Sequence, residues 1–254
     1  MKKQLVTFLG VCAVVCLCCR SVMATDFQYI NPYPPTFLGQ VTLPFQLNIC
    51  NTLQCGSGPG KSTPAMRGNA AQGAVRPQVW NPAATRYTVS PSGSLQAKAA
   101  YVQQIQRQLG PDKATLLADR LAKLDVPADW ESVVADNGLH TGDVVDALAS
   151  YFVANWVVAN KADCDRPQTL AVRDAMRATV SSGLAQVSNA ERQKYAEMTM
   201  LVVLLRLEPY AAANKAGDNA KMQLLSDFAE RDFLNTMKID LRRLALTDHG
   251  FVPK

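Results

Sequence analysis

The chain has 254 residues, of which 48% are hydrophobic and 19% are charged, and its formal net charge is +5. This length and apolar content are enough for one buried core. Part of the positive charge lies close to the first residue, and the rest of the chain has no long basic run of the kind that follows a phosphate backbone. A nucleic-acid partner is therefore not expected.

Residues 1–24 have the three parts of a secretory signal peptide. A positive start is followed by an apolar run over residues 5–19 and then by small residues, so we expect cleavage after Ala24. The apolar run is shorter than the ~20 residues that span a bilayer, which disfavours an uncleaved membrane anchor. The four cysteines of this segment lack the preceding small residue that lipid attachment requires. The sequence thus predicts an exported protein, periplasmic or secreted.

Cleavage changes the charge of the expected mature protein. It removes Lys2, Lys3 and Arg20 and no acidic residue, so 26 basic residues become 23 against 21 acidic ones, and the net charge falls from +5 to +2. The mature surface is therefore expected to be close to neutral.

Three cysteines remain after cleavage, at positions 50, 55 and 164. In an oxidising compartment they allow one internal disulfide and one free thiol. Proximity favours a bridge between Cys50 and Cys55, whereas a bridge from either of them to Cys164 would constrain more of the unfolded chain. We expect the short bridge, with the longer one as the alternative.

Residues 25–92 are rich in Pro, Gly, Asn, Gln and Thr and lack a regular apolar period. Their prolines remove amide donors and prevent long helices, so the segment is predicted to be mostly extended. Its aromatic residues are expected to pack on the domain that follows.

The stretch CGSGPGKST, residues 55–63, resembles a phosphate-binding loop. That motif needs a glycine four residues before Gly-Lys-Ser, and Cys55 stands there instead. Pro59 removes one amide from the loop, and Pro64 opposes the helix that must follow it. Nucleotide binding is therefore not expected, and no other cofactor is indicated.

Residues 93–254 show apolar side chains every three or four positions, which is typical of helices. We predict an all-α domain, a single bundle of six or seven helices. The first helix ends at Gly110-Pro111 and is expected to turn one apolar face inward. That face consists of Leu95, Ala99, Val102, Ile105 and Leu109. Two shorter helices follow, near residues 113–124 and 127–138.

The most apolar helix is predicted over residues 142–161, with Thr141 as its cap. Apolar side chains cover nearly all of its faces, so it is expected to lie at the centre of the bundle. Asp143, Asp146 and Asn155 interrupt the apolar run, which makes it a poor membrane span.

The later helices carry clear start signals. Asp165 and Pro167 open one helix, and Ser188 with Glu191 forms the capping-box pattern of the next, which is expected to bend or end near Pro209 and to stop at Gly217. The last helix begins after Asp218, and the remaining residues from position 240 are predicted to be an irregular tail. The last helix also carries charged residues that are expected to face solvent. These are Asp227, Glu230, Arg231 and Asp232.

His140 is the candidate catalytic residue. It is one of two histidines, the other being His249, and it directly precedes the central helix, close in sequence to Asp143 and Asp146. A histidine with a nearby carboxylate is suited to general-base catalysis. The sequence has no G-x-S-x-G or C-x-x-C motif, and its cysteine and histidine spacing does not fit zinc, so no metal site is predicted.

Three stretches together carry a resemblance: RYTVSPSGSLQAKAAYVQQI, ADNGLHTGDVVDALASYFVANWVVAN and LRRLALTDHGF. In this order and spacing they resemble a family of exported bacterial helical proteins catalogued only as a domain of unknown function. The resemblance covers about residues 86–252, and none is found for residues 25–85. It implies a helical, exported, mostly Gram-negative protein, and it assigns no catalytic residue.

The leading hypothesis is a non-enzymatic, envelope-associated or secreted protein whose extended segment and helical body bind a partner. It follows from the lack of catalytic motifs, the near-neutral mature charge and the two-part layout. The alternative is a hydrolase that acts on cell-envelope material and uses His140 with Asp143 or Asp146. The pattern identifies no particular partner or oligomeric state.

Overall fold

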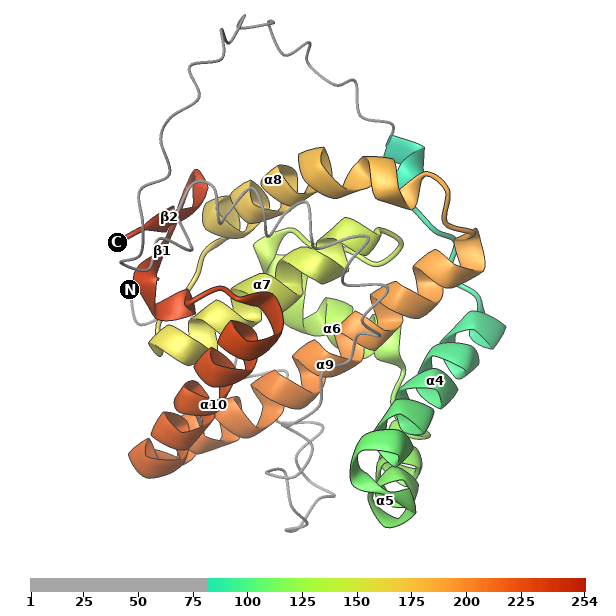
Figure 1. The fold of residues 1–254 in the computed structure, drawn as a ribbon, viewed down its shortest axis with the longest axis horizontal. Coiled ribbons are helices and arrows are strands. Elements are labelled where there is room, and N and C mark those ends of the chain that lie inside the picture. The colour runs from blue at the N-terminus through green and yellow to red at the C-terminus, as the bar shows by residue number, and fades with distance from the viewer. Residues whose placement is uncertain (1–81) are drawn as a thin grey trace, which may run out of the picture.

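The structure, a computed structural model, describes residues 82–254 apart from the side chains at positions 82, 178, 179 and 182. This part of the chain is almost entirely helical (Figure 1), which confirms the predicted all-α class. The α-helices are α4 (Pro91–Leu109), α5 (Pro111–Leu121), α6 (Val126–Val134), α7 (Val144–Asn160), α8 (Arg166–Leu184), α9 (Asn189–Ala216) and α10 (Asn219–Met237). The short elements are the 3-10 helices η4 (Pro82–Ala84), η5 (Ala135–Asn137) and η6 (Leu241–Arg243) and the strands β1 (Leu244–Thr247) and β2 (Gly250–Pro253).

Helix α7 is the central element, as its sequence predicts. It lies between α8 on one side and α9 and α10 on the other (Figure 1), and 15 of its 17 residues are buried. Its aromatic side chains pack against α10, where the rings of Phe152 and Phe233 meet edge to face at 5.1 Å. Burial of this much apolar surface is the main stabilising contribution to such a core.

The amino end of α7 differs from the prediction. The cap is Asp143, whose Oδ1 accepts the amide hydrogen of Val145 at 2.9 Å, rather than Thr141. The helix accordingly begins two residues later than expected. None of the helices in residues 82–254 is both long and apolar enough to cross a membrane.

Helices α4 and α5 form a pair at the edge of the fold, where α4 packs against α9 (Figure 1). The inward face predicted for α4 is wrong at its first half, because Leu95 is 67% exposed and Ala99 is also exposed. The face that meets α9 instead carries Gly93, Ala97 and Tyr101. A Cβ at position 93 would lie 2.0 Å from Gln193 Oε1, so a larger residue there would have to displace the Gln193 side chain.

The predicted start signals of α8 and α9 are found, with one difference. Asp165 and Gln168 form a full capping box at α8. At α9, Ser188 Oγ accepts the amide hydrogen of Glu191 as expected, but the Glu191 carboxylate pairs with Lys194. Helix α9 continues through Pro209 to Ala216, and Gly217 is its C-cap, which confirms the predicted stop.

The predicted irregular tail is wrong, since residues 244–253 form an antiparallel hairpin beside α8 (Figure 1). Leu244 and Leu246 alternate with less buried residues, which is the period of a strand with one buried face. Thr247 closes the turn: its hydroxyl donates to the Gly250 carbonyl and accepts the His249 amide hydrogen.

Candidate functional site

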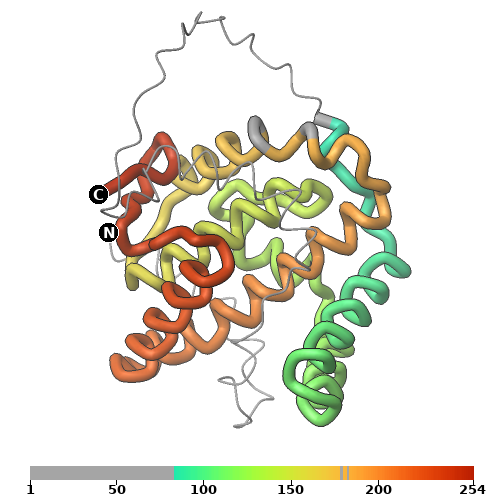
Figure 2. The backbone as a smooth tube through the Cα atoms, viewed as in Figure 1, coloured from blue at the N-terminus to red at the C-terminus, as the bar shows by residue number. Residues whose placement is uncertain are grey.

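Residues 83–90, which we call the arm anchor, hold the start of the described chain against the helices. Figure 2 follows the backbone from this segment, near the end of α8 and the start of α9, into α4. The Tyr87 amide donates to the Gly142 carbonyl at 2.9 Å, and the Val144 amide donates to the Thr85 carbonyl at 3.0 Å. Thr85 is fully buried. The arm anchor therefore docks on the loop that leads into α7.

Helix α9 holds the arm anchor from the other side. Arg192 Nη1 donates to the carbonyls of Ala83 and Ala84 at 2.9 and 2.7 Å. Asn189 Oδ1 accepts the amide hydrogen of Thr88 at 2.8 Å. These side chains bond main-chain groups of the arm anchor, which in a sheet would be bonded by a neighbouring strand.

The loop between α6 and α7 needs glycine where it meets the arm anchor. Gly142 has a φ of +89°, a backbone conformation that residues other than glycine rarely adopt. It lies between Thr141 and the capping residue Asp143, so it sets the direction in which the chain enters α7. The candidate residues at positions 140–146 all depend on this turn.

The two candidate carboxylates share one arginine from α8. Arg177 Nη2 lies 2.8 Å from Asp143 Oδ2 and 3.2 Å from Asp146 Oδ1. The second oxygen of each carboxylate also has a partner, because Asp143 Oδ1 caps α7 and Asp146 Oδ2 accepts the His140 amide hydrogen at 3.0 Å. Asp143 and Asp146 are thus both tied to the protein itself.

Asp146 is an unusual acid because its side chain is only 6% exposed. Burial, with a further contribution from the neighbouring Asp143, raises its pKa to about 6. The His140 amide and the positive charges of Arg173 and Arg177 oppose this rise. The group therefore titrates well above the ordinary range of a carboxyl group.

The imidazole of His140 lies against a different carboxylate. Its Nδ1 is 3.1 Å from Glu131 Oε1, and its side chain is 62% exposed. Thr141 Oγ1 donates to Glu131 Oε2 at 2.8 Å. Partial burial raises the pKa of Glu131, but the hydrogen bonds from Thr141 and His140 lower it overall. His140 reaches Asp146 through its backbone, while its ring faces Glu131.

A second polar group links α4 to α9 and was not predicted. Glu197 is fully buried, and its Oε1 accepts hydrogen bonds from Ser94 Oγ at 2.9 Å and Gln193 Nε2 at 2.8 Å. Gln193 Nε2 also donates to the Ser90 carbonyl at 2.8 Å, at the end of the arm anchor. Burial raises the pKa of Glu197.

The charged face predicted on α10 is wrong for two of its four residues. Asp232 is nearly buried and pairs with Arg206 of α9 at 2.8 Å, and Glu230 is also buried. The Arg206 guanidinium lies 5.1 Å from the ring centre of Phe228, which extends the same buried group. Arg231 is exposed as expected, and Asp227 pairs with Arg242 at the surface.

Several other predictions concern residues that lie outside the described part of the chain. These are the signal peptide of residues 1–24, the extended segment as far as residue 81, the Cys50–Cys55 bridge and the glycine-rich stretch 55–63. Cys164 is a free, half-buried cysteine, and burial raises the pKa of its thiol to about 11. Within residues 82–254 no three His, Cys, Asp or Glu side chains gather as metal ligands would.

Residues 7–254 match the family described as "Family of unknown function (DUF6683)". The chain belongs to this family. The match extends the resemblance seen over residues 86–252 to the segment 25–85, where none was predicted. No curated protein and no solved structure matches the chain. The function of the family is unknown, so the function of this member must be argued from its residues.

The partners of the candidate residues were missed at the sequence level, although a signal for them exists. A nearby cation stabilises a buried carboxylate, and Arg173 and Arg177 stand four residues apart on α8 beside the inward residues Val172 and Met176. That spacing places an arginine at the edge of the apolar stripe. No comparable pattern pointed to Glu131.

Proposed function

We propose that the protein is exported and acts by binding a partner, with the helical body as a fixed base for residues 25–81. The observation that carries this proposal is the arm anchor, whose main chain is hydrogen-bonded to α7, to the loop before it and to a side chain of α9. The segment that precedes it therefore joins the body at one defined place. A proline-rich, aromatic segment presented from a fixed base is suited to recognition by another protein.

The strength of the anchoring supports a role beyond that of a linker. Linkers between independent parts make few contacts with either part. Here the amide hydrogens of Tyr87 and Thr88 and the carbonyls of Ala83, Ala84 and Thr85 are all bonded to the body. Each such bond contributes about 1 kcal/mol.

The residues around the base of the arm fit the same role. Asp143 caps α7, pairs with Arg177 and forms the bridge partner of Arg86 in the arm anchor. Its carboxylate therefore connects α7 and α8 at the point where its backbone receives the arm. Such a group is best explained as a joint between three segments.

Site-specific photo-cross-linking in a Gram-negative host tests the proposal. A photoreactive amino acid replaces Tyr33 in the arm of the full-length chain, and the matched control replaces Arg107, which is exposed on α4. We expect a discrete adduct from position 33 and none from position 107, with the exported chain beginning at Thr25. An exported chain that gives no adduct at position 33, or equal adducts at both positions, rejects the proposal.

A second candidate, the envelope hydrolase, is favoured by one contact. Glu131 holds the imidazole of His140 through Nδ1 at an exposed position, as an orienting carboxylate does for a general base. If this is the function, His140→Ala and Glu131→Gln both abolish release of soluble fragments from isolated cell walls. The versions that use Asp143 or Asp146 predict the same loss for Asp143→Asn or Asp146→Asn. Unchanged release in all four variants removes this candidate.

A further inference from the structure

Residues 240–254, which we call the clasp, cover the carboxyl end of α7. Trp156 Nε1 donates to the Leu244 carbonyl at 2.8 Å, and Asn160 Nδ2 donates to the Leu241 carbonyl at 3.1 Å. Lys254 Nζ donates to Asn160 Oδ1 at 2.8 Å, so the last residue is fastened to the same helix. The clasp buries Leu241 and Leu244 against the core.

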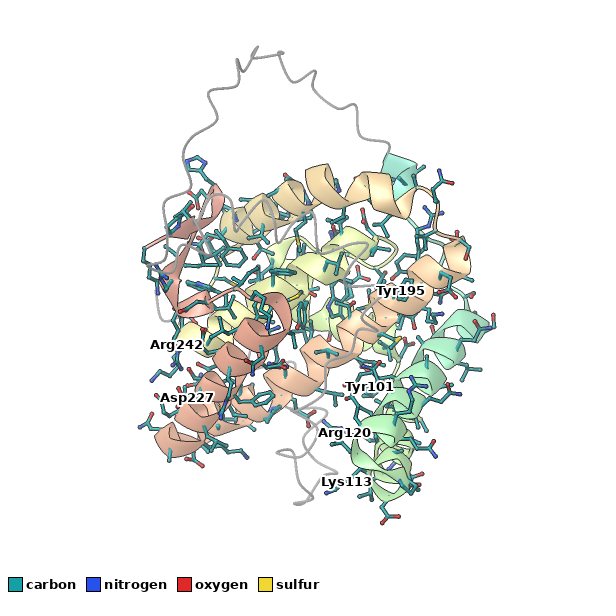
Figure 3. All side chains as sticks on the ribbon, in the orientation of Figure 1. Tyr101, Lys113, Arg120, Tyr195, Asp227 and Arg242 are labelled. Carbon is teal, nitrogen blue, oxygen red and sulfur yellow. The ribbon has the colours of Figure 1, made fainter. Side chains whose placement is uncertain are left out.

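Arg242 joins the clasp to both α7 and α10. Its Nε donates to the Ala159 carbonyl at 3.2 Å, and its Nη2 donates to Ser226 Oγ at 2.9 Å. Nη2 also donates to Asp227 Oδ1, and Figure 3 shows Asp227 and Arg242 on neighbouring segments at the same side of the molecule. The guanidinium is therefore used by a helix carbonyl, a hydroxyl and Asp227.

Glu230 provides the remaining contact between α10 and the clasp. Its Oε2 accepts the amide hydrogen of Arg242 at 3.2 Å, and the carboxyl group of Asp240 lies beside it. Burial and the neighbouring Asp240 both disfavour a negative charge on Glu230, so this position favours a proton on Glu230. Asp240 Oδ1 also accepts the amide hydrogen of Arg243 at 3.1 Å, which fixes it in place.

The cations near Glu230 are paired with other acids, so they do not take the place of its proton. Of the clasp residues, Asp240 repels a charged Glu230, and the Arg242 guanidinium attracts it while bonded to Asp227. Arg206 of α9, the cation that packs on α10, is paired with Asp232. Helix α7 contributes the uncharged carbonyl of Ala159, which Ser226 and Arg242 share. Burial and Asp240 together raise the pKa of Glu230 to about 7.

We propose that the clasp is a proton-controlled latch, closed over the end of α7 by the proton that Glu230 carries beside Asp240. Loss of the proton leaves two negative carboxylates in contact, and the clasp loosens. The sign follows from a carboxyl group that binds its proton more tightly in the closed state: closure is favoured at acidic pH and weakens as pH rises through neutrality. Loosening uncovers the indole of Trp156 and the apolar side chains beneath the hairpin. The latch does not depend on whether residues 25–81 bind a partner.

Hydrogen exchange of the mature full-length chain tests the latch. Protection of the hairpin amides, residues 244–253, is measured at pH 5.5 and 8.5 and corrected for the intrinsic exchange rates. We expect about a tenfold lower protection at pH 8.5. This is the change expected if closing of the clasp raises the pKa of Glu230 by about one unit. In Glu230→Gln no proton is gained or lost at this position, so protection should be equal at the two pH values. Asp240→Asn leaves Glu230 buried, so it should reduce the pH dependence without abolishing it.

The control variant is Asp146→Asn, which removes the other acid that titrates near neutrality. It lies at the opposite end of α7 and should keep the wild-type pH dependence of the hairpin. Equal protection of the wild-type hairpin at both pH values would overturn the proposal. It is also overturned if Glu230→Gln keeps the pH dependence, or if Asp146→Asn abolishes it.

Discussion

Arg177 on α8 lies 2.8 Å from Asp143, the residue that caps α7. The same guanidinium reaches Asp146 one turn further along, so a single side chain balances two acids at the positive end of the central helix. All three side chains are at most 15% exposed. The pairing therefore holds two helices and the docking loop of the arm anchor in one arrangement.

Arg177→Ala should lower the free energy of unfolding by about 3 to 5 kcal/mol at pH 7.5, because it leaves buried carboxylates without their cation. Chemical denaturation measures the change. The matched control is Lys194→Ala, which breaks a surface ion pair with Glu191, whose side chain is 43% exposed. This variant should lower the free energy of unfolding by less than about 1 kcal/mol. A similar small cost for both variants would mean that water compensates Asp143 and Asp146.

Asp146 should make the protein more stable in acid. Its folded-state pKa of about 6 lies above the ordinary value of 3.8, so the folded protein binds the proton more tightly than the unfolded chain. The resulting stabilisation is complete below pH 3.8 and is lost as pH rises through 6. In Asp146→Asn this contribution is absent at every pH.

The measurement compares the free energies of unfolding of the two proteins at pH 4 and 7. The wild type should lose about 2 to 3 kcal/mol more than Asp146→Asn over this interval, the amount that a shift of about two pKa units implies. Glu230 titrates in both proteins, so its contribution cancels in the difference. Parallel pH profiles would show that Asp146 does not titrate as its burial implies.

Helices whose burial is settled by their own composition could be predicted from the sequence. Residues 144–160 are apolar on nearly all sides, so no rotation of the helix could place them at the surface, and the prediction of a central helix is confirmed. Asp165 and Ser188 were likewise identifiable, because a cap depends on nearby backbone groups. Local chemistry decides such features.

Features that depend on distant partners could not be predicted. The hairpin at residues 244–253 is held by Trp156 and Gln168, each more than 70 positions away in the sequence. Similarly, the sequence puts His140 close to the start of α7, but its ring meets Glu131, which comes from α6. The tertiary fold decides which carboxylate a histidine meets, and the spacing in the sequence favoured the two that follow it.

Two substitutions in α4 test which of its faces is buried. Leu95 and Ile105 were expected to share an inward face, yet Leu95 is 67% exposed and Ile105 is fully buried. Ile105→Ala should therefore cost about 2 to 5 kcal/mol in the free energy of unfolding. Leu95→Ala should change it by no more than about 0.5 kcal/mol, since surface substitutions rarely do more. Equal losses in chemical denaturation would restore the face read from the sequence.

Arg192→Ala should free the arm anchor without unfolding the helices. Arg192 Nη1 holds the carbonyls of Ala83 and Ala84, and these contacts lie at the outer end of the segment, where local opening begins. Loss of a hydrogen bond worth about 1 to 1.5 kcal/mol should lower the protection of the Tyr87 and Thr88 amides about tenfold in hydrogen exchange. Amides in α7 should keep their protection.

The matched control for that variant is Arg107→Ala, which removes an exposed arginine from α4 and touches no part of the arm anchor. It should leave exchange at Tyr87 and Thr88 unchanged. Because Gly142 and Asn189 still bond these two amides in Arg192→Ala, complete loss of their protection is not expected. If their protection stayed at the wild-type level, Arg192 would have no part in fixing where the arm leaves the body.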